Sequence, residues 1–162
     1  MAFVKKLTPE QAFQKARHYC GYQERCHAEV KEKLYSFGLW KTDVEILLSR
    51  LIEENYLNEE RFAQQFAGGK FRIKQWGRVK IKHELKQKQV SEYCIKKAMK
   101  EIAEDEYMKV LRKLAEQKWK SVKEPGVNRF VKLSKTTAFL LQRGFESELV
   151  REILNEIERE GS

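Results

Sequence analysis

Apolar residues recur along this chain with the three- and four-residue spacing of amphipathic helices, and the pattern occurs three times. The ends of three predicted helices align as KEKLYSFGL (31–39), KHELKQKQV (82–90) and TAFLLQRGF (137–145). Beyond these segments, apolar residues fall at four shared offsets in every copy: Val44, Leu47, Leu48 and Leu51; Ile95, Ala98, Met99 and Ile102; Val150, Ile153, Leu154 and Ile157.

This recurrence predicts an all-α protein built from three tandem three-helix repeats, at residues 8–55, 56–103 and 104–159. No stretch alternates between apolar and polar residues as a half-buried strand does. A unit of three short helices cannot bury its apolar side alone, so we expect the repeats to pack into an elongated, curved array. The extra length of the third repeat is expected at Glu124-Pro125-Gly126, a turn signal. The opening helices match more loosely, through Phe62, Phe66 and Ile73 in the second repeat and Tyr107, Leu111 and Leu114 in the third.

Several residues mark helix ends. Thr8 and Gln11 predict a capping box at the start of the first helix, and Thr42 and Glu45 predict another at the start of the third. Gly38 is expected just after the second helix. Three residues occupy the same position of the alignment, near the ends of these helices: Gly38, Gln89 and Gly144.

Composition narrows the class of protein. Charged residues make up 35% of the 162 residues and apolar ones 41%, which is typical of soluble helices. No apolar run is long enough to cross a bilayer, and the N-terminal MAFVKKLTPEQ lacks the apolar core of a secretory signal. Three cysteines are too few for a disulfide framework. We therefore expect a cytoplasmic protein.

Positive charge is concentrated between residues 70 and 100. This window holds eleven Lys or Arg and two acidic residues, so its excess equals the formal net charge of +9 of the whole chain. Such a concentration favours a phosphate-rich or acidic partner. Gly77, Ile81 and Leu85 are spaced as the inward side of a helix, the second of the repeat. Four cations at the same spacing predict one outward stripe along that helix: Lys74, Arg78, Lys82 and Lys86.

No residue set indicates catalysis, a metal or a cofactor. The sequence Gly68-Gly69-Lys70 lacks the first glycine of a phosphate-binding loop and lies inside a helical pattern. No Ser-His-Asp or Cys-His arrangement is indicated. Four potential zinc ligands have a spacing that does not match the usual structural zinc sites: His18, Cys20, Cys26 and His27.

Two segments of the second repeat carry recognisable motifs, YLNEERFA (56–63) and GRVKIKHEL (77–85). They are similar to YLDD-x-RFA and G-x-x-R/K-I-R/K-x-E-L of the RecX family, whose members regulate the RecA recombinase. Arg25 and Gly38 fall in a segment similar to the signature of the family's first repeat. The resemblance extends over about residues 8–158 and is weakest in the third repeat.

The resemblance implies a regulator that binds in the groove of the RecA–DNA filament and restrains ATP hydrolysis and strand exchange, in DNA repair and the SOS response. A slim helical array with a basic central repeat suits such a groove, where it can contact more than one subunit. We expect a monomer that contacts the filament, and DNA within it, through seven side chains: Arg25, Lys70, Arg72, Lys74, Arg78, Lys82 and Lys86.

The chain also departs from the family pattern. Gly68 stands where members often have arginine, and Gln89 replaces the usual glycine. Glycine inside a helix costs about 1 kcal/mol, so the Gly68-Gly69 pair is expected to bend or fray the opening helix of the second repeat.

Two other functions fit the charge. The first is sequence-nonspecific DNA binding, because a three-helix unit can act as a helix-turn-helix. Phe71, Trp76 and Tyr93 lie in the basic window and could stack on unpaired bases, although packing at the core or its rim is the expected role of each. The second is a basic adaptor for a different acidic partner.

Overall fold

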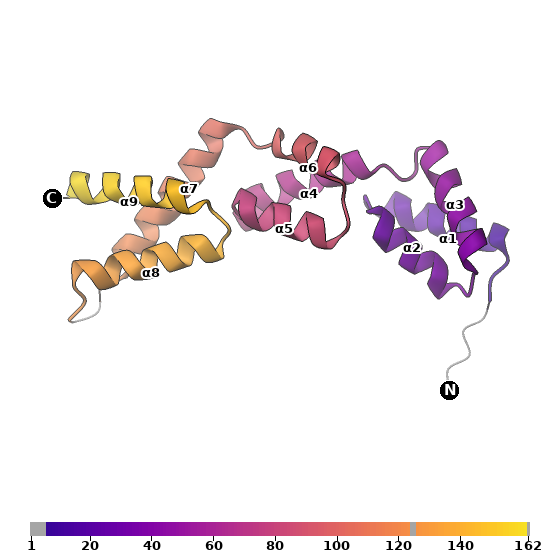
Figure 1. Cartoon of the computed structure of the whole chain (residues 1–162), viewed down its shortest axis with the longest axis horizontal. Helices are drawn as coiled ribbons and strands as arrows, with labels where there is room; N and C mark the ends of the chain where they lie inside the picture. The colour runs from indigo at the N-terminus through magenta and orange to yellow at the C-terminus, as the bar shows by residue number, and fades with distance from the viewer. Residues whose placement is uncertain (1–5, 124–125, 162) are drawn as a thin grey trace. The chain divides into compact units, whose positions relative to one another are not determined.

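The computed structural model describes residues 6–123 and 126–161, and all regular secondary structure within these ranges is helical. The all-α prediction is confirmed. None of the described helices is long and apolar enough to cross a membrane. The turn predicted at Glu124-Pro125-Gly126 lies largely outside the described residues. In this part of the chain nine helices follow one another (Figure 1): α1 (Pro9–Tyr22), α2 (His27–Ser36), α3 (Lys41–Glu53), α4 (Glu59–Lys74), α5 (Arg78–Gln87), α6 (Glu92–Met99), α7 (Glu104–Ser121), α8 (Arg129–Gln142) and α9 (Ser147–Gly161).

The chain forms two compact units that do not coincide with the sequence repeats. Residues up to Phe66 and the segment Leu85–Ala98 make the first unit, and the segment Ala67–Glu84 and residues from Met99 onward make the second. Helices α4 and α5 of the second repeat are therefore shared between the units. In the first unit α1, α2 and α3 pack against one another, and in the second α7, α8 and α9 do so. The repeat boundaries and the curvature inferred from the sequence stay predictions.

The repeated apolar positions form the cores of these units. Leu34, Leu85 and Leu140 are fully buried. All the residues at the four shared offsets are buried as well, except Met99, which is half-buried. The helical period therefore identifies the buried side of each helix. One apolar position in α4 was assigned wrongly, because Ile73 is 80% exposed.

Helix ends follow the sequence signals only in part. The capping box of Thr8 and Gln11 is present at the start of α1. The box predicted from Thr42 and Glu45 is wrong, because α3 begins at Lys41 and its N-cap residue makes no side-chain hydrogen bond. Both flanking apolar residues, Leu39 and Val44, are buried. We attribute the start of α3 to this packing, which fixes where the chain enters the helix.

The glycine pair in α4 does not interrupt the helix. Helix α4 runs unbroken from Glu59 to Lys74 through Gly68 and Gly69. A Cβ atom at Gly68 would lie 2.7 Å from the guanidinium of Arg72, one turn further on, whereas a Cβ at Gly69 would meet nothing within 4 Å. The expected fraying of α4 is therefore wrong, and a bend at the glycine pair stays a prediction.

The residue after each aligned helix has a left-handed backbone conformation. The φ angles are +84° at Gly38, +62° at Gln89 and +94° at Gly144. In each repeat the amide of this residue donates to the carbonyl three positions earlier, at Tyr35, Lys86 and Leu141. Only glycine adopts this conformation without steric cost. Gln89 is therefore the strained member of the three.

Gln89→Gly is expected to raise the free energy of unfolding of the first unit by about 0.5–1 kcal/mol, because it removes the left-handed strain. Urea unfolding followed by amide hydrogen exchange measures this change. Gln65→Gly is the matched control, since Gln65 is an exposed residue inside α4 and the same substitution there should lower stability by about 1 kcal/mol. A loss of stability in both variants would contradict the interpretation of Gln89.

The second unit contains a close backbone contact between the start of α5 and the α8–α9 turn. The amide of Gly77 donates to Arg143 O at 2.8 Å, and the amide of Val79 donates to Gly144 O at 2.9 Å. A Cβ atom at Gly77 would lie 2.3 Å from Gly144 O, and one at Gly144 would lie 2.2 Å from the Cβ of Lys80. Both glycines are therefore required for this fit.

Candidate functional site

The basic stripe predicted along one helix is divided between two helices. Lys74 is the last residue of α4, and α5 begins at Arg78. Gln75 follows Lys74 and has a φ of +56°, a left-handed conformation that ends α4. Lys82 and Lys86 remain exposed and four residues apart on α5. The placement of Lys74 on the second helix of the repeat is thus wrong, because the connection between α4 and α5 separates it from the others.

Arg78 is held by contacts inside the second unit. Its guanidinium donates from Nη2 to Glu104 at 2.6 Å, lies 3.6 Å from Glu146, and stacks 3.8 Å from the centroid of the Tyr107 ring. The Arg78 amide donates to the Tyr107 hydroxyl at 3.0 Å, and that hydroxyl donates to Glu146. Burial of Tyr107, together with the hydrogen bond to Glu146, raises the pKa of Tyr107, so the phenol stays protonated. Arg78 therefore joins the start of α5 to α7 and to the α8–α9 turn.

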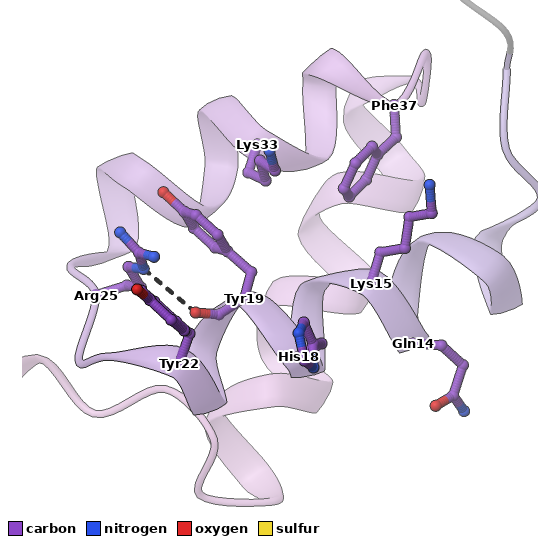
Figure 2. Close-up of a pocket in the computed structure, with 8 residues that line it drawn as sticks. All are labelled: Gln14, Lys15, His18, Tyr19, Tyr22, Arg25, Lys33 and Phe37. Carbon is purple, nitrogen blue, oxygen red and sulfur yellow. Dashed lines mark hydrogen bonds between the residues drawn. The ribbon is translucent and has the colours of Figure 1, made fainter.

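The Arg25 side chain is also held by contacts inside its own unit, the first. Its Nε donates to Tyr19 O at 3.2 Å, its guanidinium stacks 3.8 Å from the centroid of the Tyr19 ring, and Nη1 lies 3.8 Å from Glu29 (Figure 2). The Arg25 side chain is 14% exposed. Lys86, in the same unit, pairs with Glu92 at 3.6 Å on the protein surface.

Three of the seven predicted contact residues are exposed cations with no carboxylate within 4 Å in the part of the chain that the structure describes. These are Arg72 and Lys74 at the end of α4 and Lys82 on α5, all in the second unit. Two exposed apolar side chains, Ile73 and Val79, lie between these cations in the sequence. Their exposed fractions are 80% and 52%. This segment therefore offers uncompensated positive charge together with apolar surface.

The remaining predicted contact, Lys70, lies beside an aromatic side chain. Its Nζ is 4.9 Å from the centroid of the Trp76 ring, and Lys80 is 4.4 Å from the same ring. Trp76 lines a pocket of about 410 Å³ together with Phe139 and Arg143 of the third repeat. Phe139 and Arg143 could not be identified from the sequence, because no local pattern places the end of α8 beside Trp76.

Of the other residues considered for stacking or metal binding, Phe71, Cys20 and Cys26 are buried, whereas Tyr93 is exposed rather than packed in the core. Phe71 is buried against Tyr107, and Tyr93 is 62% exposed on α6. Burial raises the pKa of Cys20 and of Cys26 to about 11, so both remain thiols at neutral pH. No group of three or more His, Cys, Asp or Glu side chains among the described residues could hold a metal ion.

Comparison with known protein families gives two matches. Residues 58–99 match the second three-helix domain of RecX, and residues 104–154 match its third three-helix domain. Together the two matches cover more than half of the chain. They include the α4–α5 segment that presents Arg72, Lys74 and Lys82.

Individual relatives agree with the family matches. The chain is 31% identical over 146 residues to the regulatory protein RecX of Prosthecochloris aestuarii, covering 90% of this chain and 93% of the relative. It is 30% identical over 129 residues to that of Clostridium tetani, but spans 59% of that protein's length. The crystal structure of RecX from Lactobacillus salivarius superposes with a TM-score of 0.83 over 93% of this chain and 96% of that chain, at 21% identity. This similarity shows a shared fold.

Proposed function

The chain belongs to the RecX family, and we propose that it is a monomeric, non-enzymatic cytoplasmic regulator of the RecA recombinase that binds the RecA–DNA filament. Binding in the helical groove of the filament would restrain ATP hydrolysis and strand exchange. The family membership supports regulation of RecA. The mode of binding and the inhibitory effect are what the resemblance to this family implies, and the charge of the chain supports an anionic partner.

One observation carries the proposal: Arg72, Lys74 and Lys82 are exposed within the basic window and have no acidic neighbour within 4 Å among the described residues. Uncompensated cations gain most from an anionic partner, because no internal ion pair must be broken first. DNA phosphates and acidic protein side chains both provide such a partner. These three residues are therefore the primary contacts that we assign.

The four other predicted residues are given secondary roles. Arg25 and Arg78 are engaged by carboxylates and aromatic rings in their own units, Lys86 pairs with Glu92, and Lys70 lies beside Trp76. We propose that each of the four supports the local structure or the positive field of its own unit. Their direct contact with a filament stays a prediction.

Lys74→Glu combined with Lys82→Glu is expected to weaken inhibition of the DNA-dependent ATPase of RecA by about tenfold or more, because like charges replace attractive contacts. The measurement is the concentration of the chain that halves the ATPase rate. Lys109→Glu with Lys113→Glu is the matched control, since both are exposed lysines four residues apart on α7 of the same unit. An equal loss of inhibition in both double variants would contradict the assigned site. Full inhibition by the Lys74 and Lys82 double variant would contradict it as well.

A second candidate function is sequence-nonspecific DNA binding, which is favoured by the closeness of both Lys70 and Lys80 to the Trp76 ring. Aromatic rings flanked by cations are a common platform for nucleic acids. Salt titration of binding to bare duplex DNA, beside the ATPase measurement, separates the two. The regulator should inhibit the ATPase at concentrations well below those at which it binds bare duplex. Tight duplex binding with an unchanged ATPase would favour the second function.

A further inference from the structure

An open pocket of about 570 Å³ lies on the first unit, between α1 and α2. Figure 2 shows Arg25, Tyr19 and Tyr22 at one end of the pocket and Lys15 with Phe37 at the other. No acidic and no aliphatic side chain is among the residues that line it. The lining is dominated by rings and cations: Tyr19, Tyr22, Phe37, Lys15, Arg25 and Lys33.

The positive charge of this pocket is available to a ligand. Lys15 is exposed and has no carboxylate within 4 Å among the described residues. Lys33 Nζ lies 5.3 Å from the Tyr19 ring centroid and 5.8 Å from that of Phe37, and likewise has no acidic partner in the described chain. Arg25 is different, since it is held by Tyr19 and Glu29. Lys15 and Lys33 are therefore the two cations of the pocket that have no carboxylate partner among the described residues.

The aromatic part of the lining offers flat surface to a ligand. Tyr22 is 79% exposed, so most of its ring is open to solvent. The guanidinium of Arg25 stacks on the Tyr19 ring and hydrogen-bonds to Tyr19 O, which fixes Tyr19 in place. The pocket therefore combines an exposed ring with cations that have no carboxylate partner, which suits a ligand that has both a flat ring and negative charge.

We propose that this pocket binds unpaired nucleotides of single-stranded nucleic acid, with a base stacked on Tyr22 and the flanking phosphates on Lys15 and Lys33. Stacking on aromatic rings beside cations is how proteins hold single strands without reading their sequence. An acidic peptide fits less well, because its carboxylate side chains can pair with the two lysines but offer no flat face to the Tyr22 ring. The pocket shares only Arg25 with the filament surface proposed above, so it adds a second site to that function.

The test measures binding of the full chain to a labelled oligothymidylate, to an oligouridylate of the same length and to a hairpin duplex. Tyr22→Ser is expected to weaken binding of the single strands about 5- to 150-fold, the range for loss of one base–aromatic stack. Tyr22→Trp should retain binding. Tyr93→Ser is the matched control, because Tyr93 is an exposed tyrosine of the same unit with Lys97 5.5 Å from its ring centroid, and it should change binding less than twofold.

A second measurement addresses the phosphate contacts. Lys15→Gln with Lys33→Gln should reduce the salt dependence of single-strand binding by about 1.4 log units per log unit of salt, since each phosphate contact contributes about 0.7. Tighter binding of one oligonucleotide identifies the strand as DNA or RNA, and either supports the proposal. Unchanged binding in Tyr22→Ser, an equal loss in Tyr93→Ser, an equal loss for the hairpin duplex, or displacement of the oligonucleotide by a glutamate–tyrosine copolymer of matched charge would overturn it.

Discussion

Gly144→Ala is expected to lower the free energy of unfolding of the second unit by about 2–6 kcal/mol. At a φ of +94° a side chain costs about 1–3 kcal/mol in backbone strain. The added Cβ would also lie 2.2 Å from the Cβ of Lys80 and 2.6 Å from its backbone nitrogen, an overlap that costs about 1–3 kcal/mol. The turn cannot retreat without losing the hydrogen bond from Val79 to Gly144 O. Amide hydrogen exchange on peptides of the second unit measures the loss.

Two further alanine variants separate the causes of this effect. In Gly77→Ala the added Cβ would lie 2.3 Å from Gly144 O, but the backbone of Gly77 is not left-handed. This variant should therefore lower the free energy of unfolding by less than Gly144→Ala does. Gly69→Ala, in the same unit, meets open space inside α4 and should stabilise the unit by about 0.5–1 kcal/mol through helix propensity. If Gly144→Ala were no less stable than Gly69→Ala, the close fit of α5 on the α8–α9 turn would be wrong.

Leu85→Ala is expected to cost about 2–5 kcal/mol in the first unit, because the truncation leaves a cavity at a fully buried position. The residue is the second-repeat member of the aligned set, and its helix, α5, is shared between the two units. Thermal unfolding combined with hydrogen exchange on peptides of the first unit measures the change.

Ile46→Ala is the control for this truncation. Ile46 is 59% exposed on α3 of the same unit, and surface substitutions of this kind change stability by about 0.5 kcal/mol or less. Equal melting temperatures of the Leu85 and Ile46 variants would show that the inward side of α5 has been assigned wrongly.

Local sequence determined the helical class and the buried side of each helix. The period of the apolar residues placed Leu34, Leu85 and Leu140 correctly at fully buried positions, because burial of one side of a helix imposes its own period on the sequence. Local signals were less reliable at helix ends. Lys74 has the right spacing for a stripe with Lys82, yet the two lie on different helices, since spacing alone does not reveal where a helix stops.

The concentration of charge in residues 70–100 is a property of the sequence, but the availability of each charge is not. Arg78 and Lys82 look equivalent on a helical wheel. The fold brings Glu104 and Glu146 to Arg78 and brings no carboxylate within 4 Å of Lys82 in the described chain. Only the structure therefore separates a cation that joins helices from one that has no carboxylate beside it.

The sequence by itself determined that this chain is helical, repeats its apolar pattern three times and concentrates its positive charge in the middle. Periodicity and composition can be determined from the sequence because they depend only on residue types and on residues that are close together along the chain. The tertiary structure alone decided that Gly77 faces Gly144, and that Tyr22 and Lys33 line one pocket. These contacts join residues of different helices, and their geometry depends on how the helices pack rather than on the spacing within any one of them.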